Sequence, residues 1–380
     1  MTISWPIEAV PTPSFVVEEQ LLRNNLEQLR QIKNATGCKI LLAQKAFSMY
    51  AYYPLMAEYL DGTTASGIYE ARLGSEEFGK ETHVYSPAFR ADEITELLDV
   101  ADHFVFNSLT QWNTYKDEVL KADKICGLRI NPQISTQDGP DIYDPCAPGS
   151  RLGITLEALK TADLRGISGL HFHTLCEQDA DALAITLAKV EADFGEYLHQ
   201  MDWINFGGGH HITRPGYDTK LLCQLITHIK DTYHVQVYLE PGEAVALNAG
   251  YLVASVLDIT TNGSIQNAIL DTSATCHMPD VLEMPYRPHV LGSSLPNEAS
   301  YTYRFGGPTC LAGDIIGDYA FDQPLKIGDR VVFCDMAIYS MVKTNTFNGM
   351  PLASLYACDL KNHLTCIKTF GYDEFKRRLS

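Results

Sequence analysis

Eight short apolar runs, spread over residues 40–242, constrain the fold of this chain more than any other feature. They are ILLAQK, GTTASG, THVYSP, HFVFN, ICGLRI, ISGLHFH, WINFGGG and VQVYLEPG. Most of the gaps between them carry apolar residues at spacings of three and four, the period of a helix. Eight strand–helix alternations predict a (β/α)8 barrel. A doubly wound sheet is the competing fold, but it would gather polar residues at one crevice, whereas here they close nearly every strand.

The texture of the sequence changes after Gly242. The runs YLVASVLDITT, QNAILDTS, YTYRFGGPTC, DRVVFCDMAIYS, LASLYACD and LTCIKTF are β-rich, with few helical patterns between them. They predict a second, mainly antiparallel β-domain, and we expect the N-terminal run PSFVVEE to pair with it. The predicted boundaries are residues 24–246 for the barrel, with residues 1–23 and 247–380 forming the β-domain.

Composition limits the partners and the compartment. The chain has 29 basic and 47 acidic residues, a net charge of −18, which disfavours nucleic acid and anionic membranes as partners. Its ten cysteines are scattered and form no C-x-x-C pair, which is typical of a reduced cytosolic protein. No apolar run approaches the roughly 18 residues of a membrane span, and we see no signal peptide. A cytoplasmic protein is therefore expected.

Two predicted strand ends offer groups that suit an anionic, carbonyl-bearing ligand. Lys45 directly follows the first apolar run, where a partly desolvated amine has a lowered pKa and can form a Schiff base. A solvated lysine is the simpler alternative. Gly207, Gly208 and Gly209 end the seventh run, where their backbone N–H groups can approach a phosphate closely. A tight turn without a ligand is the alternative for the three glycines.

Two further strand ends carry ionisable side chains. Glu240 ends the eighth run, where a carboxylate needs a cationic partner such as a protonated pyridine nitrogen, or a structural salt bridge. His171 and His173 end the sixth run on one face of the strand. With His210 and His211 they could form a metal site, but no well-spaced carboxylate or cysteine completes a ligand set, so no metal is expected. An imidazole stacked on a cofactor ring suits the position better.

Together these strand ends offer an amine, a phosphate cradle, a stacking imidazole and a carboxylate, the four attachments that pyridoxal phosphate needs. The chain resembles the alanine racemase-like, barrel-type pyridoxal phosphate decarboxylases over nearly its whole length. Within that family it is most similar to the branch that acts on carboxynorspermidine and carboxyspermidine. The resemblance rests on YSPAFRADEI, HFVFNSL, SRLGI, GLHFHTLCE, NFGGGHHIT, YLEPGEAV, LDTSATCHMPD, CLAGD and TFNG.

The resemblance implies a role for each candidate in the barrel. Lys45 would carry the cofactor, His173 would stack on its ring, and Glu240 would pair with the pyridine nitrogen. The phosphate would be held by the glycine run and by one residue of the β-domain, namely Gly207, Gly208, Gly209 and Tyr339. The implied activity is decarboxylation, which yields norspermidine or spermidine.

The resemblance also implies a homodimer with shared active sites. Cys310 and Asp314, in TCLAGD, would reach into the partner's site, with Cys310 returning a proton to the substrate. The substrate's additional amines need carboxylates around them. Asp280 and Glu283, in HMPDVLEMPY, are the candidates for this role together with Asp314.

One position departs from the wider family in the way that the carboxynorspermidine branch does, and three alternative functions rest on other residues. Ornithine and diaminopimelate decarboxylases carry an arginine that helps to hold the phosphate, and this chain has Glu243 there. A diaminopimelate decarboxylase would also need an arginine for the substrate's second carboxylate, for which Arg151 and Arg287 exist. A racemase would need a catalytic tyrosine opposite Lys45, and a non-catalytic pyridoxal phosphate carrier would resemble a lone barrel.

The two carboxylated polyamines are not separated by the sequence. They differ by one methylene group, which is worth only about 1–3 kcal/mol in a pocket. Both therefore remain expected substrates.

Overall fold

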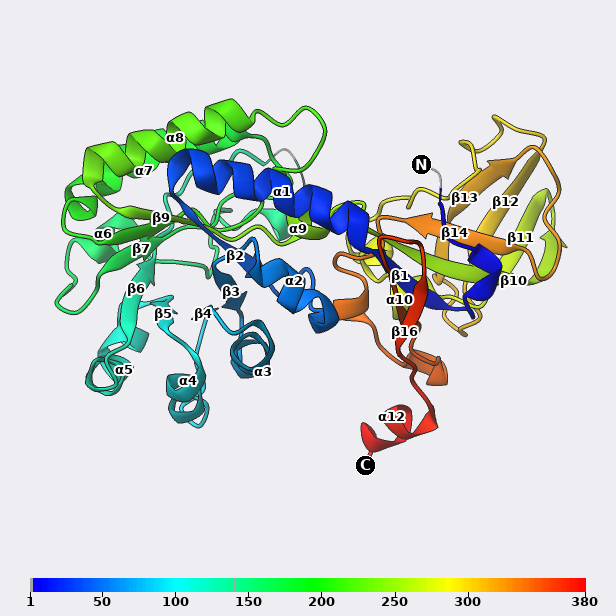
Figure 1. The fold of residues 1–380 in the computed structure, drawn as a ribbon, viewed down its shortest axis with the longest axis horizontal. Helices are drawn as coiled ribbons and strands as arrows, with labels where there is room; N and C mark the ends of the chain where they lie inside the picture. The colour runs from blue at the N-terminus through cyan, green and yellow to red at the C-terminus, as the bar shows by residue number, and fades with distance from the viewer. Residues whose placement is uncertain (1–2, 138, 140) are drawn as a thin grey trace. The chain divides into compact units, whose positions relative to one another are not determined.

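The chain divides into two compact units. The computed structural model describes residues 3–137, 139 and 141–380, drawn as a ribbon in Figure 1. Residues 25–245 form one unit, which we name the barrel unit. Residues 1–24 together with residues 246–380 form the other, which we name the sheet unit.

Eight parallel strands close the barrel in chain order, which confirms the predicted (β/α)8 fold. The strands are β2 (Lys39–Ala43), β3 (Gly62–Ala65), β4 (Glu81–Ser86), β5 (His103–Phe106), β6 (Ile125–Arg129), β7 (Gly169–His171), β8 (Trp203–Asn205) and β9 (Gln236–Leu239). The ring closes where β9 pairs with β2, with Lys39 opposite Tyr238. Leu41, Val105 and Ile204 are buried, since a covered parallel barrel buries both faces of its strands.

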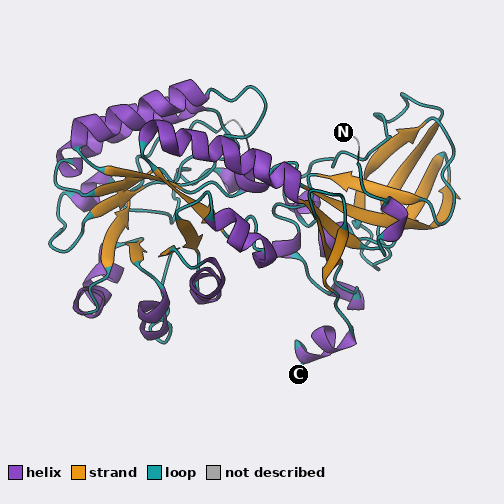
Figure 2. Ribbon diagram, in the orientation of Figure 1, coloured by secondary structure: helices purple, strands orange, loops and turns teal. Residues whose placement is uncertain are grey.

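Helices lie outside these strands (Figure 2). They are α1 (Glu19–Thr36), α2 (Tyr53–Ala57), α3 (Ile68–Leu73), α4 (Ile94–Val100), α5 (Leu109–Lys121), α6 (Leu156–Leu159), α7 (Ala180–Leu198), α8 (Thr219–Tyr233) and α9 (Glu243–Ala246). Helices α5, α7 and α8 begin where Ser108, Asp179 and Asp218 accept a hydrogen bond from a backbone N–H of the first turn. Single turns of 3-10 or π helix lie at Ile7–Ala9, Tyr50–Tyr52, Gly74–Phe78, Asp141–Tyr143, Met341–Lys343 and Phe347–Gly349.

The sheet unit has an eight-stranded sheet in the order β13-β12-β11-β10-β1-β15-β16, with β14 also pairing with β10. Its strands are β1 (Ser14–Glu18), β10 (Gly250–Asn262), β11 (Ile265–Leu270), β12 (Tyr301–Gly306), β13 (Ile315–Phe321), β14 (Arg330–Cys334), β15 (Ser354–Cys358) and β16 (Leu364–Lys368). Short helices follow at α10 (Ala274–His277), α11 (Asp280–Glu283) and α12 (Tyr372–Arg377). No helix in the described part of the chain combines the length and the apolar character that crossing a membrane requires.

The sheet is mainly antiparallel, as predicted, and the N-terminal strand lies inside it. Strand β1 pairs antiparallel with β10 and parallel with β15, and β11 and β12 also pair in parallel. The apolar runs do not predict β13, because Gly317 and Asp318 interrupt its pattern. Ile316 and Tyr319 of this strand are nevertheless buried in the core of the sheet unit.

A polar cluster lies near the amino ends of the barrel strands. Lys39 of β2 forms an ion pair with Glu81 of β4. His83 Nε2 lies 3.2 Å from Glu81 Oε2, and the His83 and His103 rings stack with centroids 3.8 Å apart and planes at 11°. Burial alone would raise the pKa of Glu81, but its hydrogen bonds with His83 and Lys39 lower that pKa to about 2. The ionised form of Glu81 therefore helps to join β2 and β4.

Replacing Glu81 by Gln is expected to lower the free energy of unfolding at neutral pH by about 2 kcal/mol. The pKa of about 2 in the folded chain lies below the ordinary 4.5, so the carboxylate stabilises fully above about pH 4.5. This stabilisation is lost as the pH falls toward 2. Urea unfolding near pH 7 and near pH 3 checks the prediction, with the exposed Glu76→Gln as the control. A difference between Glu81→Gln and the parent chain that does not shrink at the lower pH would contradict it.

Candidate active site

The carboxyl ends of β2, β7, β8 and β9 bring the barrel candidates to one rim. The carboxyl ends of parallel barrel strands always share one face. Backbone bonds join these ends directly: the Glu240 N–H donates to the Gly207 carbonyl oxygen at 2.8 Å, and the Ala43 N–H donates to the Pro241 carbonyl oxygen at 3.1 Å. We name this rim the barrel mouth.

Glu240 lies just beyond β9 with 12% of its side chain exposed, and two neighbouring strands supply its partners. Its Oε1 accepts a hydrogen bond from Asn205 Nδ2 at 2.8 Å, and its Oε2 lies 3.1 Å from His171 Nε2. Asn205 ends β8 and His171 ends β7, so three adjacent strand ends meet at one carboxylate. A largely buried carboxylate needs such partners, which is why these apolar strands end in polar residues.

The environment keeps Glu240 ionised. Burial alone would raise the pKa of Glu240, but the His171 imidazole and the Asn205 amide hold it at about 2. Desolvation lowers the pKa of His171 below its ordinary value. A neutral His171 donates its Nε2–H to the ionised Glu240, while its buried Nδ1 has no hydrogen-bond partner among the described residues. The Glu240 carboxylate therefore carries a negative charge at neutral pH and favours a proton on any base that faces it.

The orientation of the His173 ring is fixed by the glycine run. Its Nδ1 accepts a hydrogen bond from the Gly208 N–H at 2.8 Å, so the ring proton belongs on Nε2. Desolvation, and then the charges of Lys45 and Arg129, lower the pKa of His173 well below its ordinary value. His173 is thus a neutral imidazole, held in one orientation at the mouth.

The glycine run needs its glycines for steric reasons. Gly207 and Gly209 have φ values of +68° and +82°, in the left-handed region. A Cβ atom on Gly209 would lie 1.9 Å from the Leu175 carbonyl oxygen, and one on Gly208 would lie 2.5 Å from that of Glu240. The segment therefore packs against the loops that follow β7 and β9 more closely than any side chain allows.

The three glycine N–H groups have different partners. The Gly207 N–H donates to Asn205 Oδ1 at 2.8 Å, and the Gly208 N–H donates to His173 Nδ1 at the same distance. Within the described part of the chain, the Gly209 N–H donates to no other residue. Of the three glycines predicted to cradle a phosphate, Gly209 is thus the one whose N–H has no acceptor among the described residues, while the N–H groups of the other two orient Asn205 and His173.

Lys45 lies in the turn that follows β2, and its side chain is exposed. Desolvation by the surrounding protein, and then the Arg129 charge, lower the pKa of Lys45, although the Glu240 charge opposes this. The Lys45 side chain can be both exposed and desolvated, because the neighbouring residues of the barrel mouth displace bulk water around it while leaving one side open to solvent. A lysine with a lowered pKa has more of the neutral amine, which is the nucleophilic form.

Arg129 and Tyr85 belong to the mouth, although the sequence analysis did not single them out. Arg129 ends β6 with 4% of the residue exposed, and its guanidinium lies 4.6 Å from the centroid of the Tyr85 ring. Its Nη2 donates to the His173 carbonyl oxygen at 3.1 Å, and the Tyr85 hydroxyl donates to Asn107 Oδ1 at 2.7 Å. Asn205 was missed in the same way. All three are polar side chains at or next to the end of a strand, and this position could have indicated them from the sequence.

Glu243, which the resemblance to the wider family made a point of departure, lies beside His211. Glu243 Oε1 is 3.4 Å from His211 Nε2. Desolvation alone would lower the pKa of His211, but Glu243 raises it. The side chain of Glu243 is thus directed at a group that favours positive charge.

The candidates in the sheet unit lie around one loop. Cys310 is exposed, and its N–H donates to Asn348 Oδ1 at 2.8 Å. Asp314 is 3% exposed and accepts hydrogen bonds from Ser273 Oγ at 2.9 and 3.0 Å and from Thr309 Oγ1 at 2.7 Å. Asp314 therefore holds the loop that carries Cys310, and its contact with substrate stays a prediction.

The two acids predicted to bind substrate amines already hold an amine of this chain. The Lys343 ammonium forms ion pairs with both Asp280 and Glu283 of α11, whose side chains are 13% and 55% exposed. Burial raises the pKa of Asp280, and Lys343 opposes that rise. Tyr339, the predicted phosphate ligand, lies between β14 and the turn Met341–Lys343, with φ at +47°.

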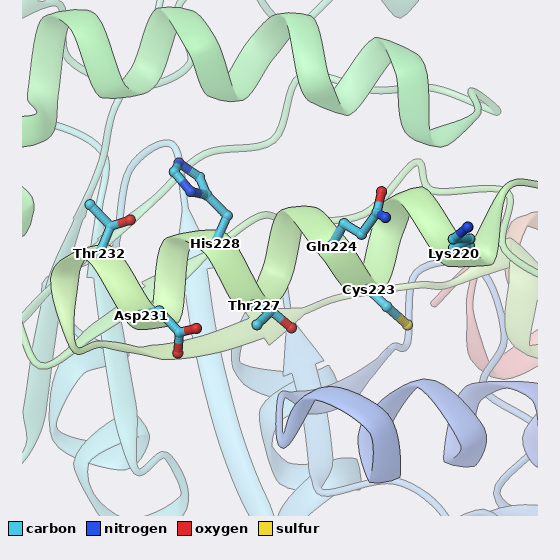
Figure 3. Close-up of a pocket in the computed structure, with 7 residues that line it drawn as sticks. All are labelled: Lys220, Cys223, Gln224, Thr227, His228, Asp231 and Thr232. Atoms are coloured by element: carbon cyan, nitrogen blue, oxygen red, sulfur yellow. The ribbon is translucent and has the colours of Figure 1, made fainter.

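A shallow hollow elsewhere on the barrel unit is separate from the mouth. Figure 3 shows its lining, which comes entirely from α8: Lys220, Cys223, Gln224, Thr227, His228, Asp231 and Thr232. His228 Nε2 lies 2.9 Å from Glu191 Oε1 of α7, which is an ordinary pair between neighbouring helices. None of the candidate residues lines this hollow.

Known proteins share both the sequence and the fold. The family model described as "Pyridoxal-dependent decarboxylase, C-terminal sheet domain" matches residues 31–337. The carboxynorspermidine/carboxyspermidine decarboxylase of Campylobacter jejuni is 45% identical over 382 residues, covering 98% of this chain and 99% of that protein. The carboxyaminopropylagmatine decarboxylase of Synechocystis is 42% identical over 374 residues, covering 98% and 96%.

Solved structures give the same picture. The crystal structure of carboxynorspermidine decarboxylase from Campylobacter jejuni, complexed with norspermidine, matches with a TM-score of 0.90 at 44% identity, covering 97% of this chain and 100% of that one. The diaminopimelate decarboxylase of Helicobacter pylori has the same fold, with a TM-score of 0.84 at 17% identity, covering 98% and 97%.

The barrel mouth fits the cofactor that the family model names. Pyridoxal phosphate needs an amine, a cradle for its phosphate and a carboxylate for its pyridine nitrogen. Lys45 offers the amine, the Gly209 N–H has no acceptor among the described residues, and Glu240 is ionised. With this fit and the match over residues 31–337, the chain belongs to the pyridoxal-dependent decarboxylase family.

Proposed function

We propose that the protein removes CO₂ from carboxynorspermidine and carboxyspermidine to give norspermidine and spermidine. The observation that supports this most strongly is the likeness, over nearly the full length of both chains, to the Campylobacter jejuni enzyme at 45% identity. The matching crystal structure of the carboxynorspermidine decarboxylase from that organism was solved with norspermidine. Diaminopimelate decarboxylases match at no more than 25% identity among the relatives compared, which supports the shared fold only.

The barrel residues have complementary roles in this proposal. When bound, pyridoxal phosphate supplies an electron sink for the electron pair that departing CO₂ leaves behind. The Lys45 amine attaches the cofactor and is suited to this because its pKa is lowered. Glu240 holds a proton on the ring nitrogen, because a fixed carboxylate favours the positive form of its partner. His173 offers a flat neutral face, and the Gly209 N–H binds the phosphate, with Tyr339 as a second ligand.

The substrate's distal amines provide the specificity. Each is a cation at neutral pH and needs acceptors, preferably charged ones. Asp280 and Glu283 are the proposed acceptors, because they already bind an ammonium, that of Lys343. Substrate would displace Lys343 from this pair. A second carboxylate, as in diaminopimelate, would be repelled there.

A specific observation favours a second substrate. The Synechocystis relative, 42% identical over 374 residues, is named for carboxyaminopropylagmatine. Its name indicates a guanidinium in place of the terminal ammonium. Because an acid pair accepts either cation, the two substrate classes must be separated by measurement.

Steady-state kinetics on the candidate substrates test the proposal. CO₂ release should be fastest, by kcat/KM, with carboxynorspermidine or carboxyspermidine, and Lys45→Ala should abolish it together with the absorbance of bound cofactor. Carboxyaminopropylagmatine as the best substrate would move the assignment to the second class. Preference for diaminopimelate, or no CO₂ release from any of them, would refute the proposed function.

Asp280→Asn is expected to raise KM for the carboxylated polyamine by about tenfold to a hundredfold, because one charged hydrogen bond is worth about 1.5–3 kcal/mol. The affinity for pyridoxal phosphate, followed by fluorescence titration of the cofactor-free protein, should stay the same. Asp322→Asn, at an exposed acid of the same unit, is the matched control. Unchanged KM in Asp280→Asn, or an equal loss of cofactor affinity, would remove this residue from the substrate pocket.

We further propose that the protein works in the cytoplasm as a homodimer with shared active sites. No disulfide joins any of the ten cysteines, all of which lie in the described part of the chain, and a reducing compartment preserves such thiols. Cys310 is exposed next to Leu311, which is 43% exposed, and its loop contacts the segment of Phe347, which is 45% exposed. Exposed apolar residues around a functional thiol are expected where a partner covers them. Cys310 then returns a proton to the carbon that has lost CO₂.

A mixing experiment tests the shared site. Lys45→Ala and Cys310→Ala should each be nearly inactive alone. If each site takes Lys45 from one chain and Cys310 from the other, equal amounts of the two variants, dissociated and reassociated, should recover about a quarter of the parent activity. No recovery, in a mixture shown to be dimeric by light scattering, would place both residues of each site in one chain.

A further inference from the structure

Three loops at the carboxyl ends of β7, β8 and β9 bring together an imidazole and two carboxylates. Glu177 follows β7, His211 follows β8 and Glu243 follows β9 in the chain. One possible ligand atom from each of the three lies within 4.8 Å of the other two. The side chains of His211 and Glu243 are 10% and 19% exposed. The sequence indicates His211 as a possible metal ligand but not its two carboxylate partners, because the three residues are more than 30 positions apart.

The His211 imidazole is buried without the hydrogen bonds that such a group normally makes. Among the described residues, neither Nδ1 nor Nε2 of His211 has a hydrogen-bond partner. The nearest carboxylate oxygen, Glu243 Oε1, lies 3.4 Å from Nε2. A charge-assisted hydrogen bond would bring such a pair to about 2.7–2.9 Å.

The longer separation is the one expected between two ligands of a single ion. Metal–nitrogen and metal–oxygen bonds to transition metals are about 2.1 Å long, with ligand–metal–ligand angles of about 90–110°. Those values place two ligand atoms about 3.0–3.4 Å apart. The His211–Glu243 separation of 3.4 Å lies at the upper end of that range.

The nearby Arg214 has contacts of its own. The Arg214 N–H donates to the His211 carbonyl oxygen, while its guanidinium lies 3.4 Å from Asp179 Oδ2. A divalent ion would supply positive charge next to the two carboxylates. An imidazole with two carboxylates is a donor set that suits Zn²⁺, Mn²⁺ or Co²⁺.

A second trio in the barrel shows what an unsuitable geometry looks like. Glu81, His83 and His103 are also within ligand distance of one another. There the two imidazole rings are stacked at 3.8 Å with planes at 11°, so no ion can lie in both ring planes, and Lys39 already pairs with Glu81. Proximity alone therefore does not make a site.

We propose that Glu177, His211 and Glu243 bind one divalent transition-metal ion, which ties the loops after β7, β8 and β9 together. His211 is two residues beyond Gly209, so the ion would hold the glycine run in place from behind. Water would complete the coordination, since three protein ligands leave positions open. The proposal does not depend on which carboxylated substrate the enzyme uses.

Metal titration of the tag-free, chelator-treated holoenzyme tests this proposal. Calorimetry with Zn²⁺ and with Mn²⁺, and elemental analysis after dialysis, should give one ion per chain. His211→Gln and Glu243→Gln should each weaken binding about a hundredfold or more, because even loss of an outer partner costs about tenfold to a hundredfold. At an ion concentration about 100 times Kd, the melting temperature of the parent holoenzyme should rise by about 3–6 °C.

The control is His228→Gln, which breaks the exposed His228–Glu191 pair on α7 and α8 and should bind the ion as the parent does. Absence of binding at about 1 mM ion would overturn the proposal and leave a proton on His211 as the occupant. Binding that survives His211→Gln, or that is lost equally in His228→Gln, would place the ion elsewhere and overturn it as well. Circular dichroism of each variant confirms that the fold is intact.

Discussion

The barrel mouth depends on one buried carboxylate. Glu240 is removed from most solvent, so its charge must be met by donors from the protein. His171 and Asn205 supply them from the ends of the two preceding strands. Asn205 also accepts the Gly207 N–H, and the next glycine donates to His173. A single requirement, the solvation of Glu240, thus orders the ends of β7, β8 and β9 and the loop between them.

Much of this could be predicted from the sequence, because it depends on local pattern. The eight apolar runs predicted the eight barrel strands, and the residues at their ends predicted Lys45, His173 and Glu240 as a group. Position along a strand is enough to place a side chain at the rim of a barrel. The comparisons with known proteins then confirmed the fold, the family and its cofactor.

The pairings within the site could not be predicted, because they join residues that are distant in the chain. Asn205 and Glu240 are 35 residues apart, and Lys343 is 63 residues from Asp280. The local sequence does not indicate that the N–H groups of Gly207 and Gly208 already have acceptors. It also does not indicate that the Lys343 ammonium pairs with the two acids of α11. Strand β13 was missed for the opposite reason, since its local pattern is weak while its packing is good.

The hydrogen bond from the Gly208 N–H to His173 Nδ1 joins the glycine run and the imidazole ring into one rigid group. In the proposed function, this rigid group contacts the cofactor at two points: Gly209 binds the phosphate and His173 stacks on the face of the ring. The distance between these two contact points is then set by the backbone and not by two independently mobile side chains. The site therefore fixes the distance between the ring and the phosphate of its ligand. A cofactor analogue with a longer or shorter link between ring and phosphate could contact either His173 or Gly209, but not both at once.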